Sequence, residues 1–171
     1  MPQIRIGLLL FPRMTQLDLT GPFEVFAKMP GAETLLLWKT LEPVEAESGL
    51  RMLPHATFAD CPQLDVLCVP GGPGVNDLME DETTLAFLRR QAAGARFLSS
   101  VCTGSLVLGA AGLLRGKRAT SHWSARDLLA AFGAIPTSGR VVRDGTLLTG
   151  GGVTAGIDFA LTMVAELAGV A

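Results

Sequence analysis

Short apolar runs that stop at turn residues alternate with longer segments of helical period along this chain. Strands are predicted over residues 4–11, 34–40, 65–70 and 97–101. Helices are predicted over residues 18–28, 82–94, 103–114 and 154–167. Parallel strands need long crossover connections, which are usually helical, so this alternation favours an α/β sandwich with a mainly parallel sheet.

The C-terminal part of the chain carries three further predicted features. Residues 124–132 are predicted to form a helix that Ser124 caps. The Asp-Gly pair at 144–145 is a strong turn signal, so residues 141–143 and 146–149 are predicted to pair as a hairpin. In the last helix, one apolar stripe is predicted to be the packing face: Ile157, Leu161, Val164 and Leu167.

Length and composition narrow the classes of protein to which the chain can belong. Residues 1–171 fit a single domain, and 49% hydrophobic with 18% charged residues is typical of a globular enzyme or binding domain. The net charge of -2 provides no basic field for nucleic acid or an anionic membrane. The three cysteines argue against a disulfide framework and no secretory signal is evident, so we expect a cytoplasmic protein with reduced thiols.

Cys102 stands directly between the strand predicted at 97–101 and a helix that starts at Thr103. Such a junction forces a sharp turn that lifts the side chain above the sheet. The helix N-terminus is expected to stabilise a thiolate and to lower the thiol pKa, which favours a nucleophile. The alternative is a small buried apolar residue, the interpretation we prefer for Cys68 in its strand and for Cys61 in a loop.

Two adjacent glycines end the strand predicted at 65–70, within the sequence PGGPG. Glycine permits backbone conformations that turn an N–H group towards a ligand. The hypothesis is that the amides near Gly72 and at Thr103 form a pair of donors for negative charge developing on a substrate atom bound to Cys102. The alternative is a simple glycine-rich turn.

Asp18 follows the first predicted strand, within QLDLTGPFEVF. Its carboxylate could cap the next helix, which the chain would enter through Pro22. The functional alternative is that Asp18 reaches the thiol of Cys102. Two anions so close disfavour each other, so the carboxyl pKa would rise and the group would suit acid–base work.

The chain has two histidines, and neither belongs to a metal-binding pattern. His55 is expected in a loop or at a strand edge, whereas His122 could approach Cys102 as a partner base. His122 and Trp123 are also candidates for a substrate pocket. The sequence contains no histidine–cysteine spacing typical of metal ligands and no glycine fingerprint for phosphate or dinucleotides, so we expect no metal and no organic cofactor.

Five motifs follow one another along the chain: QLDLTGPFEVF, VPGGPG, SVCTGSLVLGAAGLL, ATSHW and GGVTAGIDFAL. Together they resemble the ThiJ/PfpI superfamily and, within it, the isonitrile hydratases. The resemblance runs from the first strand to about residue 167. It implies a flavodoxin-like three-layer sandwich, usually a homodimer, with a reactive cysteine on a nucleophile elbow.

The resemblance also implies roles for individual residues. Carried onto this sequence, the reactive cysteine is Cys102, with Asp18 beside it and oxyanion donors at Gly72 and the Thr103 backbone. PfpI-type proteases and deglycases tend to have histidine directly after the cysteine, so Thr103 favours the hydratase branch. The hydratases also carry a Pro-rich tail with tyrosine, whereas this sequence has no tyrosine.

Such residues suit a cofactor-independent lyase that hydrates a small isocyanide to an N-formamide. The Cys102 thiolate would attack the isocyanide carbon to give a covalent thioimidate, and Asp18 would supply the proton and then activate water. One alternative is a small-molecule sensor domain like those of AraC-type regulators, although the sequence offers neither the length nor the charge for their DNA-binding region. Another is a redox sensor in which Cys102 is oxidised.

Overall fold

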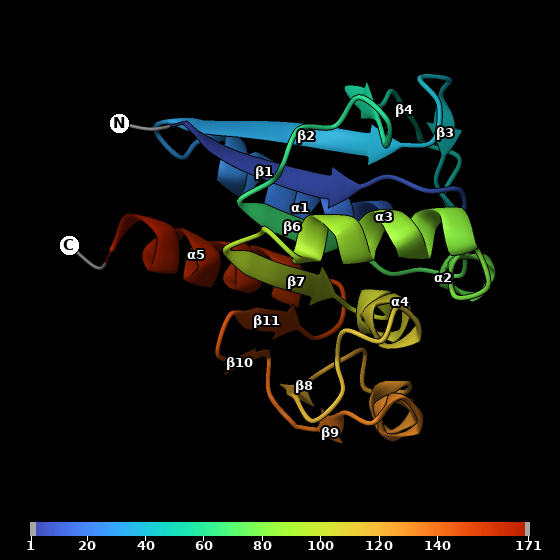
Figure 1. Cartoon of the computed structure of the whole chain (residues 1–171), viewed down its shortest axis with the longest axis vertical. Helices are drawn as coiled ribbons and strands as arrows, with labels where there is room; N and C mark the ends of the chain where they lie inside the picture. The colour runs from blue at the N-terminus through green and yellow to red at the C-terminus, as the bar shows by residue number, and fades with distance from the viewer. Residues whose placement is uncertain (1–2, 170–171) are drawn as a thin grey trace.

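A seven-stranded sheet forms the centre of the computed structural model, which describes residues 3–169 (Figure 1). Its strands are β1 (Ile4–Leu9), β2 (Ala32–Trp38), β5 (Ala56–Thr57), β6 (Val66–Val69), β7 (Phe97–Val101), β10 (Val141–Asp144) and β11 (Leu147–Gly150). Their order in the sheet is β10-β11-β7-β6-β1-β2-β5, and every neighbouring pair is parallel except the β10–β11 hairpin. The predicted mainly parallel sheet is confirmed.

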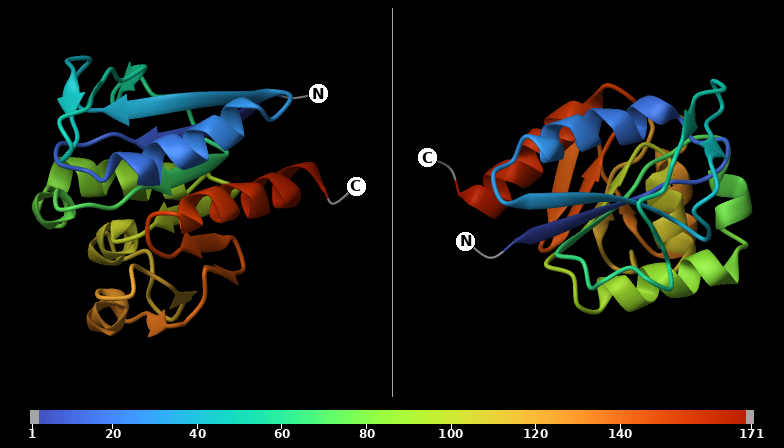
Figure 2. Two further views of the ribbon diagram at one scale, coloured as in Figure 1. Left: turned by 180° about the vertical axis from the view of Figure 1, so that it is seen from behind. Right: turned by 90° about the horizontal axis from the view of Figure 1, so that it is seen from above.

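Helices cover both faces of this sheet and complete three layers (Figures 1 and 2). One face carries α1 (Gln16–Ala27) and α5 (Ala155–Ala168), which pack side by side. The other carries α3 (Glu82–Ala92) with the short helices α2 (Val75–Leu78) and α4 (Gly104–Ala110). The predicted α/β sandwich is therefore confirmed. Within residues 3–169, no helix combines the length and the apolar character that a membrane span requires.

Four further short strands form two separate two-stranded sheets. Strands β3 (Val44–Glu45) and β4 (Arg51–Met52) form one ribbon, and β8 (Arg118–Ala119) pairs with β9 (Ile135–Pro136). The helix predicted at 124–132 is instead a 3₁₀ helix, η1 (Arg126–Phe132), between β8 and β9. Ser124 does not cap it, because its hydroxyl lies 2.7 Å from Nδ1 of His122.

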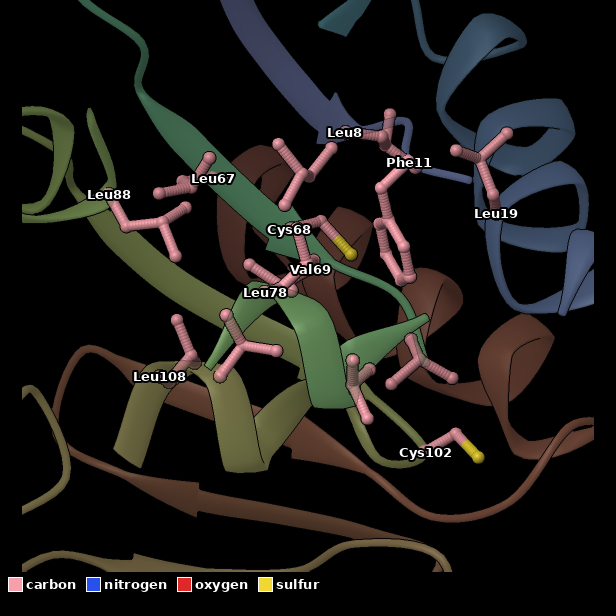
Figure 3. Packing of buried hydrophobic residues seen from close by; sticks show 14 of the residues in the cluster. Leu8, Phe11, Leu19, Leu67, Cys68, Val69, Leu78, Leu88, Cys102 and Leu108 are labelled. Atoms are coloured by element: carbon pink, nitrogen blue, oxygen red, sulfur yellow. The ribbon is translucent and has the colours of Figure 1, made fainter. Parts of the chain in front are cut away.

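The central strands are apolar because the helical layers bury both of their faces. All four residues of β6 are buried. Cys68 of β6 belongs to the same apolar cluster as Leu8 and Phe11, as Figure 3 shows. Cys102 lies at the turn after β7, with its side chain directed away from that group. The packed core therefore fixes the position of the strand end that carries Cys102.

The apolar stripe predicted as the packing face of α5 is only partly confirmed: Val164 and Leu167 pack against the core, whereas Ile157 and Leu161 are exposed. Ile157 is 43% exposed and Leu161 is 54% exposed. The buried face consists instead of Ala155, Gly156, Phe159, Ala160 and Met163. Apolar residues surround this helix on more than one side, so periodicity alone did not identify the face that packs. The small residues determine which face of α5 packs, because Gly156 lets this helix approach Pro22 of α1 closely.

Two predicted boundaries also shift. The helix predicted at 103–114 ends at Ala110, since α4 spans Gly104–Ala110. In the predicted hairpin, Asp144 pairs with Leu147, so the two turn residues are Gly145 and Thr146. Asp144 extends β10 because its carboxylate accepts a hydrogen bond of 2.8 Å from the backbone N–H of Arg118.

Candidate active site

Three strand ends that lie far apart in the sequence meet at one edge of the sheet. Strands β7, β6 and β1 are neighbours, and their carboxyl ends lead to Cys102, to Gly71 and towards Asp18. The chain leaves β1 through α1 to reach β2 on one side, while β6 lies on the other side. In open α/β sheets such a reversal of strand order opens a crevice for ligands. The fold thus places these three segments where a ligand can reach them.

Asp18 points into this crevice and does not cap its helix. It is fully buried, and its Oδ2 accepts a hydrogen bond of 3.1 Å from the backbone N–H of Gly71. Helix α1 starts at Gln16, before Asp18, and Pro22 lies inside the helix. The capping interpretation of Asp18 and the helix entry through Pro22 are therefore wrong.

Cys102 occupies the sharp turn that its place between strand and helix predicts. Its φ of 56° lies in the left-handed region, which is strained for a residue with a side chain. Its N–H donates to the carbonyls of Gly150 at 3.1 Å and Gly151 at 3.0 Å. Its own carbonyl accepts hydrogen bonds from the hydroxyls of Ser121 at 3.0 Å and Ser105 at 3.3 Å. These bonds hold both peptide groups of the strained residue in place.

Glycine is required on both sides of this turn because backbones approach each other closely there. A Cβ on Gly71 would lie 2.6 Å from the N atom of Thr103 and 2.9 Å from Cβ of Cys102. A Cβ on Gly104 would lie 2.6 Å from the carbonyl oxygen of Pro70. All three distances are below any normal contact, so a larger residue would displace the cysteine from Asp18.

Asp18 and Cys102 perturb each other's protonation. Burial raises the pKa of Asp18 to about 6, against the lowering effect of its contacts with the Cys102 thiol and the Gly71 amide; the charge of Glu47 adds to the rise. The predicted rise of the carboxyl pKa is confirmed, but its predicted cause is wrong: burial raises this pKa, whereas the contact with the Cys102 thiol lowers it. Sequence reasoning did not find Glu47, which the β3–β4 ribbon brings near the site.

The predicted low pKa of the Cys102 thiol is wrong. Burial and the charge of Asp18 raise this pKa to about 12, while backbone N–H groups of Thr103 and Val153 favour the thiolate. The N-terminus of α4 does not compensate, because the helix has only seven residues and the sulfur has lost most of its water. The thiol therefore carries its proton at neutral pH.

The two groups together behave as one acid that carries a single negative charge between pH values of about 6 and 12. In that range either the carboxylate or the sulfur is charged, and the remaining proton lies on the other group. Oδ1 of Asp18 is buried and has no partner of ordinary hydrogen-bond geometry within residues 3–169. This oxygen is therefore left to receive the thiol proton.

The two predicted backbone donors have different partners in the structure. The N–H of Thr103 acts on the sulfur, whereas the N–H of Gly72 donates a hydrogen bond of 3.0 Å to Oγ1 of Thr103. The second N–H that acts on the sulfur belongs to Val153, which sequence reasoning missed. Its φ of 22° is unusual for a branched residue, and the preceding glycines at 150–152 were the available signal.

A cavity of about 550 Å³ opens above Cys102. Its walls are mostly apolar and include Val75, Leu106 and Leu128, and no aspartate, glutamate, lysine or arginine lines it. His122 lines this cavity, as predicted for a substrate pocket, whereas Trp123 lines a neighbouring one. Asp18, rather than His122, is the side chain that interacts with the thiol.

The other two cysteines and His55 have structural roles away from the candidate site. Cys68 is fully buried in β6, and Cys61 donates its S–H to the carbonyl of Pro62 at 3.2 Å. Nδ1 of His55 accepts a hydrogen bond of 2.9 Å from the backbone N–H of Leu36. In the part of the chain that the structure describes, no three histidine, cysteine or acidic side chains gather as metal ligands would.

Comparisons with known proteins agree with the family that the five motifs indicate. The isonitrile hydratase of Pseudomonas putida is 64% identical over 167 residues, which cover 98% of this chain and 73% of that protein. The HTH-type transcriptional regulator GbdR of Pseudomonas aeruginosa is 33% identical over 168 residues, which cover 93% of this chain and 45% of the regulator.

Solved structures and the family profile lead to the same result. A THiJ/PfpI family protein from Pseudomonas syringae superposes with a TM-score of 0.95 at 53% identity and covers 98% of this chain and 70% of its own. The profile of the DJ-1/PfpI family matches residues 4–166. The resemblance to the ThiJ/PfpI superfamily is confirmed: the chain belongs to the DJ-1/PfpI family.

Proposed function

We propose that this chain is an isonitrile hydratase, a lyase that converts an isocyanide and water to an N-formamide. The observation that carries the proposal is the buried pair of Asp18 and Cys102 beneath an apolar cavity of about 550 Å³. The relative that is 64% identical over 98% of the chain, an isonitrile hydratase, supports the same activity.

Formation of a covalent intermediate uses the proton that the pair shares. The thiol of Cys102 transfers its proton to Asp18, and the sulfur attacks the terminal carbon of the isocyanide. Asp18 then delivers the proton to that carbon, so the product is a thioimidate with a new C–S bond and a new C–H bond. The raised pKa of Asp18, about 6, suits a group that must accept and release a proton near neutrality.

Hydrolysis of the thioimidate regenerates the thiol. Asp18, again a carboxylate, takes a proton from water as the oxygen adds to the thioimidate carbon. Asp18 passes this proton to the nitrogen and accepts the hydroxyl proton of the tetrahedral intermediate as the C–S bond breaks. It returns that second proton to the departing sulfur, so the thiol is restored and the N-formamide leaves. The N–H groups of Thr103 and Val153 stabilise negative charge on the departing sulfur of Cys102.

A sensor without turnover is the competing interpretation, and the site supports it less well. Ligand binding alone has no need for a strained cysteine in contact with a buried carboxyl. A redox sensor in which Cys102 is oxidised would need no cavity of about 550 Å³ above the sulfur. The regulator GbdR shares 33% identity with this chain, about half the identity of the hydratase.

We also propose that two copies of the chain form a dimer through the outer face of α1 and α5. Ile157 and Leu161 are exposed there, beside a groove of about 400 Å³ that Val25 and Val164 help to line. Exposed apolar patches of this kind favour association. Light scattering is expected to give a dimer for the wild type and a monomer for Leu161→Glu, whereas Leu41→Glu, at another exposed leucine, is expected to stay dimeric.

The activity is tested by incubation of the protein with an aryl isocyanide in H₂¹⁸O. We expect an N-formamide that carries one ¹⁸O atom, and intact mass after rapid acid quench should show the protein plus one isocyanide molecule. Tryptic mapping should place that mass on Cys102. Absence of formamide over a panel of aryl and alkyl isocyanides would instead favour the sensor.

A further inference from the structure

A second cavity adjoins the catalytic one. Its volume is about 510 Å³, and His122 and Val153 line both cavities, so these two residues form the boundary between them. The mechanism above uses no residue of this second cavity except Val153. Its walls come from the segments around η1, β9 and the start of α5.

Charge distinguishes the second cavity from the first. Arg126 and Arg140 line it, and no acidic side chain does. Arg140 forms an ion pair with Asp158 and donates a hydrogen bond of 3.2 Å to Oγ1 of Thr154. Arg126 forms no ion pair and no side-chain hydrogen bond with residues 3–169. The cavity therefore presents one guanidinium whose charge the surrounding protein does not balance.

A guanidinium presents paired N–H donors that match the two oxygens of a carboxylate. We infer that this second cavity binds a carboxylate carried by the substrate, at the opposite end from its isocyano group. The inference rests on the proposed hydratase activity and narrows its substrate class to isocyanides with an anionic substituent. The neutral isocyano end occupies the uncharged cavity above Cys102, and the carboxylate passes His122 to reach Arg126.

Trp123 supports the same interpretation. Its side chain is 77% exposed although it lines the second cavity, and its ring lies 5.5 Å from that of His122. An exposed indole is costly in water and is common where a ligand packs on it. The two rings offer an apolar surface to the chain that joins the isocyano group to the carboxylate.

The test compares isocyanoalkanoates of increasing chain length with their methyl esters, which differ only in charge. In the wild type we expect kcat/KM for the best acid to exceed that of its ester by about tenfold or more, the range of a charge-assisted hydrogen bond. Arg126→Gln should remove this preference by lowering kcat/KM for the acid about tenfold or more relative to the ester, and Arg126→Lys should keep part of it. Arg96→Gln, at an exposed arginine before the start of β7, is the matched control and should keep all of it.

Binding without turnover gives an independent measurement. Cys102→Ala protein is titrated by calorimetry with N-formyl aminoalkanoates, the expected products, and we expect Arg126→Gln in the same background to weaken binding about tenfold or more. Equal turnover of acid and ester, with no effect of Arg126→Gln, would overturn the inference while the hydratase activity stands. Binding of free acetate as tight as that of the formyl acids would overturn it too. Failure to hydrate any isocyanide would reject the hydratase, whereas the titration would still report on the carboxylate site.

Discussion

Cys68 lies within β6 and Cys102 directly follows the neighbouring strand β7, and the two share the properties by which a reactive cysteine is usually judged. Cys68 is fully buried and Cys102 is 5% exposed. Burial is the main cause that raises the pKa of each thiol to about 12, and the charge of Asp18 contributes to both. Neither accessibility nor pKa therefore separates the two.

Their surroundings separate them. Both cysteines belong to the apolar cluster of Figure 3, but Cys68 sits within β6 and has regular strand backbone. Cys102 has a positive φ, interacts with the Asp18 carboxyl and lines a cavity of about 550 Å³. We therefore propose Cys102 as the nucleophile because a base that can take its proton and space for a substrate lie beside it, and not because of a low intrinsic pKa.

The largest expected difference between the two cysteines is in the effect of exchanging each for alanine. Cys102→Ala is expected to lower kcat by at least about 10⁴-fold, because no other group can form the covalent bond. Cys68→Ala should keep kcat within about threefold and lower the free energy of unfolding by about 1–2 kcal/mol, since it leaves a small cavity. Formamide production and urea unfolding measure the two effects. Comparable losses of activity would contradict the assignment.

Asp18→Asn should separate the two cysteines by removing the base that only one of them uses. Without a proton acceptor for the Cys102 thiol, kcat/KM is expected to fall by about 10²–10⁴-fold, the usual range for general acid–base catalysis. Asparagine retains the size and the carbonyl that accepts from Gly71. If Asp18→Asn retained full activity, the proton transfer proposed here would be excluded.

The same variant should change stability in a pH-dependent way. The pKa of Asp18 rises from 3.8 to about 6 on folding, so its favourable contribution is complete below pH 3.8 and is lost as the pH rises through 6. Relative to the wild type, Asp18→Asn should therefore gain free energy of unfolding between these pH values, by up to about 3 kcal/mol in total. Denaturant unfolding at pH 4.5 and pH 8 measures the gain. A difference that does not grow with pH would show that burial of Asp18 does not raise its pKa.

The pH dependence of turnover has the smallest expected effect but the most specific outcome. The active form of the Asp18–Cys102 pair carries one negative charge, so kcat/KM should rise about tenfold per pH unit below a pKa of about 6. It should then stay level to pH 9, because the second proton leaves near pH 12. A rise centred near pH 8–9 would instead indicate a free thiolate formed without Asp18.

Local patterns in the sequence predicted most of the architecture. The long periodic segments became the central strands and the helices α1, α3 and α5, and Cys102 was identified from its place between β7 and α4. The packing face of α5 was only partly predicted because its apolar residues surround the helix. The Val153 N–H was missed because a backbone group leaves no mark in the residue type.

The five motifs indicated the family by resemblance. Hydrophobic period and turn residues predicted the parallel sheet and the strand end that bears the cysteine, because these signals act over a few positions. Only the tertiary structure decided the chemistry of that cysteine. The thiol pKa depends on how much water the fold removes and on which charge it brings near, and the Asp18 carboxyl comes from 84 positions away in the chain (102 − 18 = 84). Desolvation of this kind is a property of three-dimensional packing, so no short pattern around Cys102 encodes it.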